Sequence, residues 1–290
     1  MIPSLQQVCE RALTLPCSPA LLPRLNAVLA NPDAGVDDVE AVLRVDPVLA
    51  SATIRLANSA FFSSAQSPVE SVGEAVMRLG LREAYKLAAT ALAGRWMTLQ
   101  VEGYRWEPGD FFRVSLVTAL AAEELASETE AVDPSQAYTA GLVLEIGKLA
   151  LAHACADAFG EIRTVQRASG CTWLEAERNV LGYNHAMIGA RLLREWKFAE
   201  HFALVAEYNP PGAELPESVR ALAAHVHAAK YLASCLGPGQ GEDGFLYVVN
   251  ASLLAEHGLD AARLERAMVP VFEKTAKILR DKFAVGEIRI

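Results

Sequence analysis

The chain has 290 residues, of which 52% are hydrophobic and 21% charged, with a net charge of −9. This composition predicts a dense globular protein and argues against a nucleic-acid partner, because phosphate binding draws on a basic surface. No hydrophobic run is long enough to span a membrane without a charge or a helix breaker. The N-terminus lacks the basic region of a signal peptide, and the five cysteines form no CxxC pair. We therefore expect a cytoplasmic protein with reduced thiols.

Hydrophobic residues recur every three to four positions along nearly the whole chain, which predicts an all-α, multi-helical fold. Several helix starts carry a cap, as at Asp133-Pro134 and at Thr172 with Glu175 three positions later. The expected helices cover about 18–30, 37–45, 47–60, 71–80, 81–100, 110–128, 134–154, 172–182, 185–197, 199–208, 217–236, 245–256 and 260–282.

The polar stretch VEGYRWEPGD, residues 101–110, separates two halves of the chain. It predicts an N-terminal helical subdomain over about 13–105, packed on a second helical subdomain over about 108–230. The remaining residues, 231–290, form a C-terminal helical extension. Within that extension the glycine-rich segment 237–244 is typical of a flexible, exposed loop.

The helix expected around YTAGLVLEIGKLAL, residues 138–151, is apolar on most sides and should be buried. It nevertheless contains Glu145 and Lys148, which are three positions apart and can share a face. A buried charge is costly unless it is paired or bound to a ligand. Glu145 therefore belongs either to a metal or catalytic site or to an internal ion pair.

Of the six histidines, only His185 is a candidate site residue. It follows LGYN and opens a helix, whereas His225 and His227 are two positions apart, a poor spacing for joint metal ligation. The chain has no nucleophile elbow, phosphate-binding loop or dinucleotide fingerprint in the required strand-then-helix setting.

The segment RLANSAFF places Asn58 and Ser59 between apolar neighbours at a helix end. One interpretation is a C-terminal cap in which Asn58 takes the left-handed conformation. The alternative is a binding determinant in a groove between the subdomains. We favour the cap, because cap chemistry explains the asparagine without a further assumption.

These motifs together resemble a known family. The DP pair before RLANSAFF, the capped helix ending in MRLGL, and the later stretches AGLVLEIGKLAL and EAERNVLGYNHAMIGARLLREWKF are similar to the HDOD domain, an HD-related output domain of bacterial signalling proteins. The resemblance covers about 13–230. It implies an HD-like helical subdomain over 108–230.

The related HD-type phosphohydrolases bind metal through a histidine, a His-Asp pair and a distant aspartate. By this resemblance, the first position falls on Val114, the pair on Leu144-Glu145 and the distant acid near Lys230. The histidine of the LGxxH motif is retained as His185. A further pair of histidines found in many relatives falls on Tyr208 and Asn209.

The residues implied by the resemblance make a poor metal site, since such a site needs three or four ligands. We expect no metal, no cofactor and no catalytic residue. Glu145, His185, Lys230, Tyr208 and Asn209 are then remnants of a degenerate site, in which Glu145 bonds Lys148, Lys230 or His185.

The expected function is a non-catalytic signal-transduction output module, a pseudoenzyme that binds signalling proteins in trans. No receiver, kinase, cyclase or phosphodiesterase domain is recognisable in the sequence. Two alternatives remain open: a metal-dependent phosphohydrolase acting on nucleotides or cyclic dinucleotides, and a pocket that binds a small nucleotide without hydrolysing it.

Overall fold

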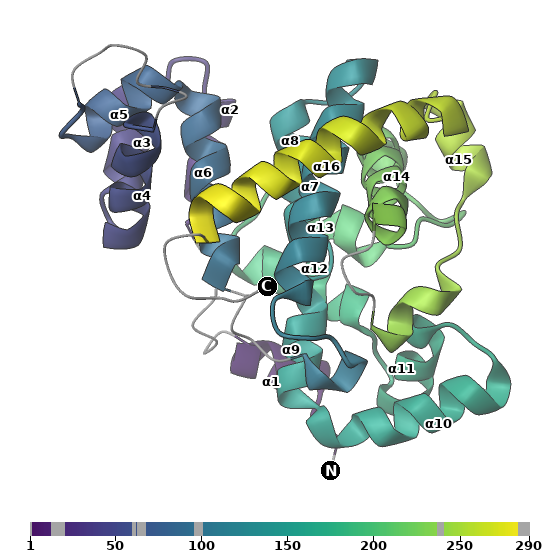
Figure 1. Ribbon diagram of the computed structural model, residues 1–290. Helices are drawn as coiled ribbons and strands as arrows, with labels where there is room; N and C mark the ends of the chain where they lie inside the picture. The colour runs from purple at the N-terminus through teal and green to yellow at the C-terminus, as the bar shows by residue number, and fades with distance from the viewer. Residues whose placement is uncertain are drawn as a thin grey trace. The chain divides into compact units, whose positions relative to one another are not determined.

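A computed structural model describes residues 2–12, 21–59, 62, 68–95, 101–236 and 241–283. These residues are helical with short connections and contain no strand, only an isolated bridge between Val101 and Trp106. The all-α prediction is confirmed (Figure 1). No helix among these ranges combines the length and hydrophobicity that a membrane crossing requires.

The chain divides into two compact units. Unit 1 contains residues 1–15, 97–195 and 199–290, and unit 2 contains residues 16–96 and 196–198. The helices of unit 1 are α1 (Leu5–Ala12), η2 (Glu102–Tyr104), α7 (Asp110–Thr129), α8 (Pro134–Val143), α9 (Ile146–Ala154), η3 (Ala156–Ala158), α10 (Phe159–Ser169), α11 (Trp173–Leu181), α12 (His185–Glu195), α13 (Glu200–Glu207), η4 (Glu217–Val219), α14 (Arg220–Leu236), η5 (Glu242–Leu246), α15 (Ala251–Glu256) and α16 (Ala261–Phe283). Unit 2 contains α2 (Leu22–Ala30), α3 (Val36–Leu43), α4 (Pro47–Ala57), α5 (Val72–Leu79) and α6 (Leu81–Ala93).

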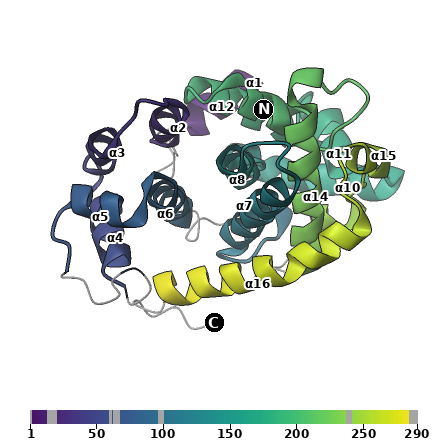
Figure 2. The same ribbon diagram turned by 90° about the horizontal axis from the view of Figure 1, so that it is seen from above.

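Helix α7 is the centre of unit 1, where it packs against α8, α14 and α16 (Figures 1 and 2). Its buried residues lie on nearly every side, in keeping with its apolar sequence. Gly141 on α8 permits a close approach, because a Cβ there would lie 2.9 Å from the Cα of Ala119.

The single helix expected over 134–154 is wrong: the chain breaks at Leu144 and Glu145 into α8 and α9. Glu145 has φ −107° and ψ 20°, outside the helical values, and precedes the first residue of α9. Periodicity could not reveal this break, because both helices are apolar on most sides and no glycine or proline marks the junction.

Three other expectations differ from the structure in unit 1. Helix α10 was not predicted at all, and the helix expected over 245–256 begins only at Ala251, capped by Asn250. The loop prediction for 237–244 is wrong for its last residues, since η5 starts at Glu242 and Gly241 is buried. Residues 237–240 lie outside the described part.

Unit 2 has its own core, in which Ala57, Val69, Ala75 and Leu79 pack together. Helix α5 begins with a side-chain cap, in which Ser71 Oγ accepts a hydrogen bond from Glu74 N at 3.1 Å. The expected helix start at 18–20 and end at 96–100 lie outside the described residues, so only α2 and α6 themselves can be compared.

Candidate functional site

The site is positioned by the contact between α9 and α12. Gly147 makes this contact possible, because a Cβ at this residue would lie 1.9 Å from the carbonyl oxygen of His185. Gly189, on α12, faces Gly147 across the interface. A Cβ built on Gly189 would lie 3.3 Å from Gly147 N. The two backbones therefore meet directly, which places His185 beside the residues flanking Gly147.

Glu145 accepts hydrogen bonds from two buried ammonium groups. Lys148 Nζ lies 2.8 Å from Glu145 Oε1, and Lys230 Nζ, from α14, lies 2.5 Å from Oε2. The three side chains are only 4–12% exposed. Each carboxylate oxygen has its own cationic partner, which offsets much of the cost of burying the charge.

The pKa values of this cluster follow from burial opposed by neighbouring charges. Burial raises the pKa of Glu145, but Lys148 and Lys230 outweigh it and hold that pKa well below its ordinary value. Burial lowers the pKa of Lys148, but Asp243 and Glu145 raise it above the ordinary value. For Lys230 burial prevails, and its pKa is lowered even though Glu145 is beside it.

Asp243 completes the cluster from η5 and was missed by sequence reasoning. Its carboxylate pairs with Lys148 and accepts a hydrogen bond from Trp106 Nε1 at 2.9 Å. Lys148 Nζ also lies 5.4 Å from the centre of the Trp106 ring, within range of a cation–π contact. The sequence gives no sign of a site at Asp243, because the glycines around it are typical of an exposed loop.

Glu177, on α11, is the second residue that sequence reasoning missed. It is fully buried and accepts hydrogen bonds from Tyr104 Oη at 2.6 Å and from the backbone N of His185 at 2.8 Å. Its carboxylate also contacts His185 Nδ1 at 2.8 Å. A carboxylate beside Nδ1 fixes the proton there and orients the ring. His185 thus bonds Glu177 and not Glu145.

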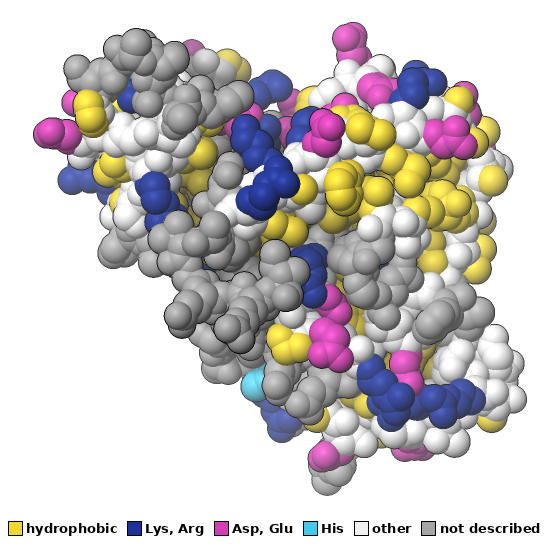
Figure 3. Space-filling model, viewed as in Figure 1, with side chains coloured by type: hydrophobic (Ala, Val, Ile, Leu, Met, Phe, Trp, Pro, Cys, Tyr) yellow, Lys and Arg dark blue, Asp and Glu magenta, His cyan; other side chains and the backbone are white. Residues whose placement is uncertain are grey.

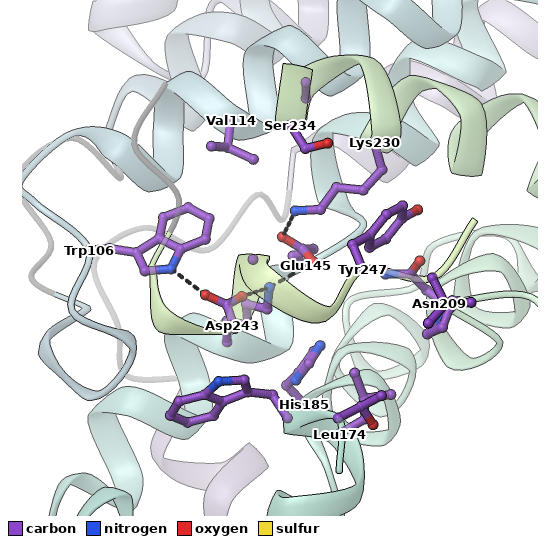
Figure 4. A pocket seen from close by; sticks show the side chains of 17 residues that line it. Trp106, Val114, Glu145, Leu174, His185, Asn209, Lys230, Ser234, Asp243 and Tyr247 are labelled. Atoms are coloured by element: carbon purple, nitrogen blue, oxygen red, sulfur yellow. Dashed lines mark hydrogen bonds and ion pairs between the residues drawn. The ribbon is translucent and has the colours of Figure 1, made fainter. Parts of the chain in front are cut away.

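The other ring nitrogen, His185 Nε2, is buried and has no hydrogen-bond partner among the described residues. His185 lines a cavity of about 80 Å³, shown in Figure 4, where Lys230 and His185 approach the cluster from opposite sides. The lining includes Trp106, Val114, Glu145, Lys148, Trp173, His185, Asn209, Lys230, Asp243 and Tyr247.

Most of the residues predicted as site remnants meet at this cavity. Glu145, His185, Asn209 and Lys230 line it, whereas Tyr208 ends α13 and is not part of the lining. Val114, at the position implied for a histidine ligand, also lines the cavity. Four of the five residues that the resemblance implies as remnants therefore share one cavity, and Tyr208 does not.

These residues do not fit a divalent metal ion. No group of three histidine, cysteine, aspartate or glutamate side chains lies close enough for ligation within the described ranges. Both oxygens of Glu145 already bond ammonium groups, which repel a cation. The two other positions implied as ligands carry the apolar side chains of Val114 and Leu144.

Asn58 and Ser59 belong to unit 2 and are not among the residues that line this cavity. Asn58 Oδ1 accepts from Val69 N at 2.8 Å, and its Nδ2 donates to Val69 O at 2.9 Å. The left-handed cap is wrong, because the non-glycine residues with positive φ in the described part are Arg105, Glu130 and Lys197. The buried Ser59 Oγ has no hydrogen-bond partner within the described ranges.

Comparison with known proteins gives the same fold. An HDOD protein of unknown function from Geobacter sulfurreducens is 22% identical, with a TM-score of 0.65 over 96% of this chain and 94% of that one. A protein of Shewanella amazonensis SB2B, provisionally named a phosphohydrolase, is 27% identical, with a TM-score of 0.64 over the same shares. A provisionally named signal transduction protein of Marinobacter aquaeolei VT8 is 23% identical, with a TM-score of 0.71 over 97% of this chain and 61% of that one.

A curated relative, an uncharacterized protein of Treponema pallidum (strain Nichols), is 24% identical over an alignment of 230 residues that covers 74% of this chain. The chain spans only 41% of that relative's length. The HDOD domain model matches residues 15–210, more than half of the sequence. The chain therefore belongs to the HDOD domain family.

Proposed function

We propose that the chain is a non-catalytic module of signal transduction, whose HD-like site stabilises unit 1 and whose surface binds a partner protein in trans. One observation carries this proposal: both oxygens of Glu145 are paired with lysine ammonium groups. Membership of the HDOD family and the fold shared with a provisionally named signal transduction protein support the signalling role.

Metal-assisted phosphoester hydrolysis requires a bound cation that activates water or polarises the phosphate. In this chain the carboxylate that could bind such a cation is occupied by Lys148 and Lys230. A cation that displaced Lys230 would leave its buried ammonium without this partner, which is strongly unfavourable. Lys148 would keep its pair with Asp243. The cluster is thus better suited to holding α9, α14 and η5 together than to catalysis.

The first test is elemental analysis of protein purified without chelator or added metal. We expect zinc, manganese and iron contents far below one equivalent, and equal contents in wild type and Glu145→Ala. Stoichiometric metal that disappears in Glu145→Ala would contradict the proposal.

The second test is a panel of phosphoesters, nucleotides and cyclic dinucleotides assayed with manganese, magnesium or iron. We expect no turnover above that of His185→Ala. Turnover that His185→Ala abolishes would establish the alternative function, a phosphohydrolase.

Capture of partners from the native cell under several growth conditions should recover a signalling enzyme or regulator, and repeated failure would weigh against a protein-binding role.

A second candidate function, binding of a small ligand without hydrolysis, is favoured by the unpartnered Nε2 of His185. The cavity of about 80 Å³ is well below the roughly 300–1,000 Å³ of ordinary ligand pockets. In this conformation it suits a ligand of a few atoms better than a nucleotide. Thermal-shift screening tests this, because a ligand that binds only the native state raises the Tm, and His185→Asn should remove the rise.

A further inference from the structure

Three arginines converge on one carboxylate at the surface of unit 1. Glu242 Oε2 lies 2.6 Å from Arg163 Nε, and its Oε1 lies 3.1 Å from Arg105 Nη1 and 3.4 Å from Arg167 Nη2. Arg163 and Arg167 are one turn apart on α10, and Arg105 follows η2. Basic side chains gather over α10 in Figure 3. We call Arg105, Arg163 and Arg167 the arginine cluster.

The arginine cluster carries more positive charge than Glu242 neutralises. The side chains of Arg105 and Arg167 are 60% and 66% exposed, so they remain open to solvent although they contact Glu242. Within this group of four side chains two positive charges are in excess, on a chain whose net charge is −9. A ligand with more than one carboxylate would satisfy this cluster better than Glu242 alone does.

The site also binds the peptide backbone that carries Glu242. Trp173 Nε1 donates a hydrogen bond to the carbonyl oxygen of Glu242 at 2.9 Å. The backbone of Gly241 lies against Trp106, where a Cβ would come within 2.1 Å of the indole ring. Recognition of a main chain together with its carboxylate distinguishes a peptide from a phosphate or a nucleic acid.

Glu242 and Asp243 are adjacent in the chain, so a movement of the backbone at the arginine cluster also moves the residue that pairs with Lys148 beside the cavity. Glu242 occupies the arginine cluster, while Asp243 pairs with Lys148 beside the cavity. We call residues 241–244 the acidic segment. Removing this segment from the arginine cluster would loosen the wall that Asp243 and Gly244 contribute to the cavity.

We propose that the arginine cluster is a docking site for an acidic peptide segment of a partner protein, and that the partner's carboxylates displace Glu242. The inference rests on the proposed protein-binding function and adds the chemistry of the partner. Exposed arginine–carboxylate pairs are individually weak, so a partner with several acidic residues can compete. The acidic segment has the advantage of being tethered, which gives it a millimolar effective concentration.

The test is fluorescence anisotropy with a fluorescein-labelled peptide GEDGFL, the sequence of residues 241–246, and with the neutral peptide GQNGFL as control. The proteins are wild type, Glu242→Gln, and Glu242→Gln with Asp243→Asn, all in the full chain. We expect both variants to bind GEDGFL at least tenfold more tightly than wild type. The single variant retains the Asp243–Lys148 pair, so it decides the question if the double variant does not fold.

Two further replacements test whether the peptide binds at the arginine cluster. Adding Arg105→Gln and Arg167→Gln, both at exposed positions, should weaken GEDGFL binding at least tenfold, and added salt should weaken it as well. In wild type, saturating GEDGFL should increase hydrogen exchange across 241–250.

Equal affinity of wild type and Glu242→Gln, equal binding of GQNGFL, or no change in exchange would overturn the inference. Tighter binding of a phosphoserine peptide or an oligonucleotide would also overturn it, by assigning the cluster to phosphate. None of these results depends on metal content or phosphoester turnover. The arginine cluster can therefore fail to bind the peptide while the elemental analysis and turnover assays still support a non-catalytic module.

Discussion

At the scale of single residues, Glu145 is the only carboxylate that pairs with Lys230 in the described part of the chain. Lys148 has Asp243 as a second partner, so it keeps one ion pair if Glu145 is replaced. The two lysines therefore depend on Glu145 to different degrees, and the buried Lys230 depends on it most.

Glu145→Gln should destabilise the protein by about 3–5 kcal/mol, because it leaves the Lys230 ammonium buried without a countercharge. The change is measured by urea unfolding. The matched control is Glu256→Gln, which breaks an ion pair of Arg220 with a side chain that is 50% exposed. That loss should be within about 1 kcal/mol, and equal losses in the two variants would contradict the role of burial.

Sequence reasoning found Glu145, Lys148, Lys230 and His185 because a charge in an apolar helix is conspicuous and because the resemblance supplied their positions. It missed Glu177, which lies among ordinary helix formers in EAERNVL, and Asp243, which lies between glycines. Each reaches the site only through tertiary packing. No local pattern records that packing.

At the scale of helices, the contact between α9 and α12 leaves no room for a side chain at Gly147. Gly147→Ala would place a Cβ 1.9 Å from His185 O, so the helices must move apart. We expect a loss of about 1–3 kcal/mol or more in urea unfolding. Gly160→Ala on α10 is the control, because a Cβ there meets nothing within 4 Å. It should be neutral or stabilise by about 0.4–1 kcal/mol.

His227 on α14 anchors the segment that follows η5. Its Nε2 accepts from Asn250 N at 2.9 Å, so its Nδ1 carries the proton that faces Tyr247 Oη at 2.6 Å. Burial lowers the pKa of His227 from 6.5 to about 4. Its neutral form is therefore the one that fits the fold.

The folded-state pKa of His227 lies below the unfolded value, so its neutral form contributes to the free energy of unfolding. This contribution is fully present above pH 6.5 and is lost as the pH falls toward about 4. Protonation of Nε2 also removes the bond from Asn250 N. We expect urea midpoints to fall over this range and hydrogen exchange of Asn250 to rise. His227→Gln should flatten both responses, and an unchanged pH dependence in that variant would refute the assignment.

The expected helix pattern was most accurate where a cap marked the start, as at Asp133 for α8 and Thr172 for α11. It failed at Glu145, where packing breaks the helix between two equally apolar segments. It also failed over α10, whose sequence FGEIRTVQRAS has only two buried residues, Phe159 and Ile162. A weak apolar face gives periodicity little to detect.

At the scale of the whole molecule, each unit has a core of its own, so local damage should remain local. Asn58→Ala leaves the N–H and carbonyl of Val69 unpaired and should destabilise unit 2 by about 1–3 kcal/mol. Hydrogen exchange should increase in α5 but not in α9. Glu145→Gln is the reciprocal control, in which hydrogen exchange should increase in α9 but not in α5. Increased exchange in both helices for both variants would contradict separate cores.

The fold class was predictable because helical periodicity persists through both units. The assignment of residues to units was harder to foresee. Residues 2–12 precede unit 2 in the sequence, yet α1 packs on α9, with Arg11 donating to Ala154 O. Such a contact between distant segments leaves no trace in composition or spacing.

The pairing of Glu145 with two lysines also constrains how this sequence can change. Lys230→Asp would restore the acid implied for an HD-type site, but it would add a third buried carboxylate to Glu145 and Asp243, with only Lys148 to neutralise all three. A histidine at Leu144 alone would add a ligand without removing either ammonium. Lys230→Asp should therefore lower stability, and a histidine at Leu144 would leave both ammonium groups on Glu145, so neither substitution alone produces a metal site.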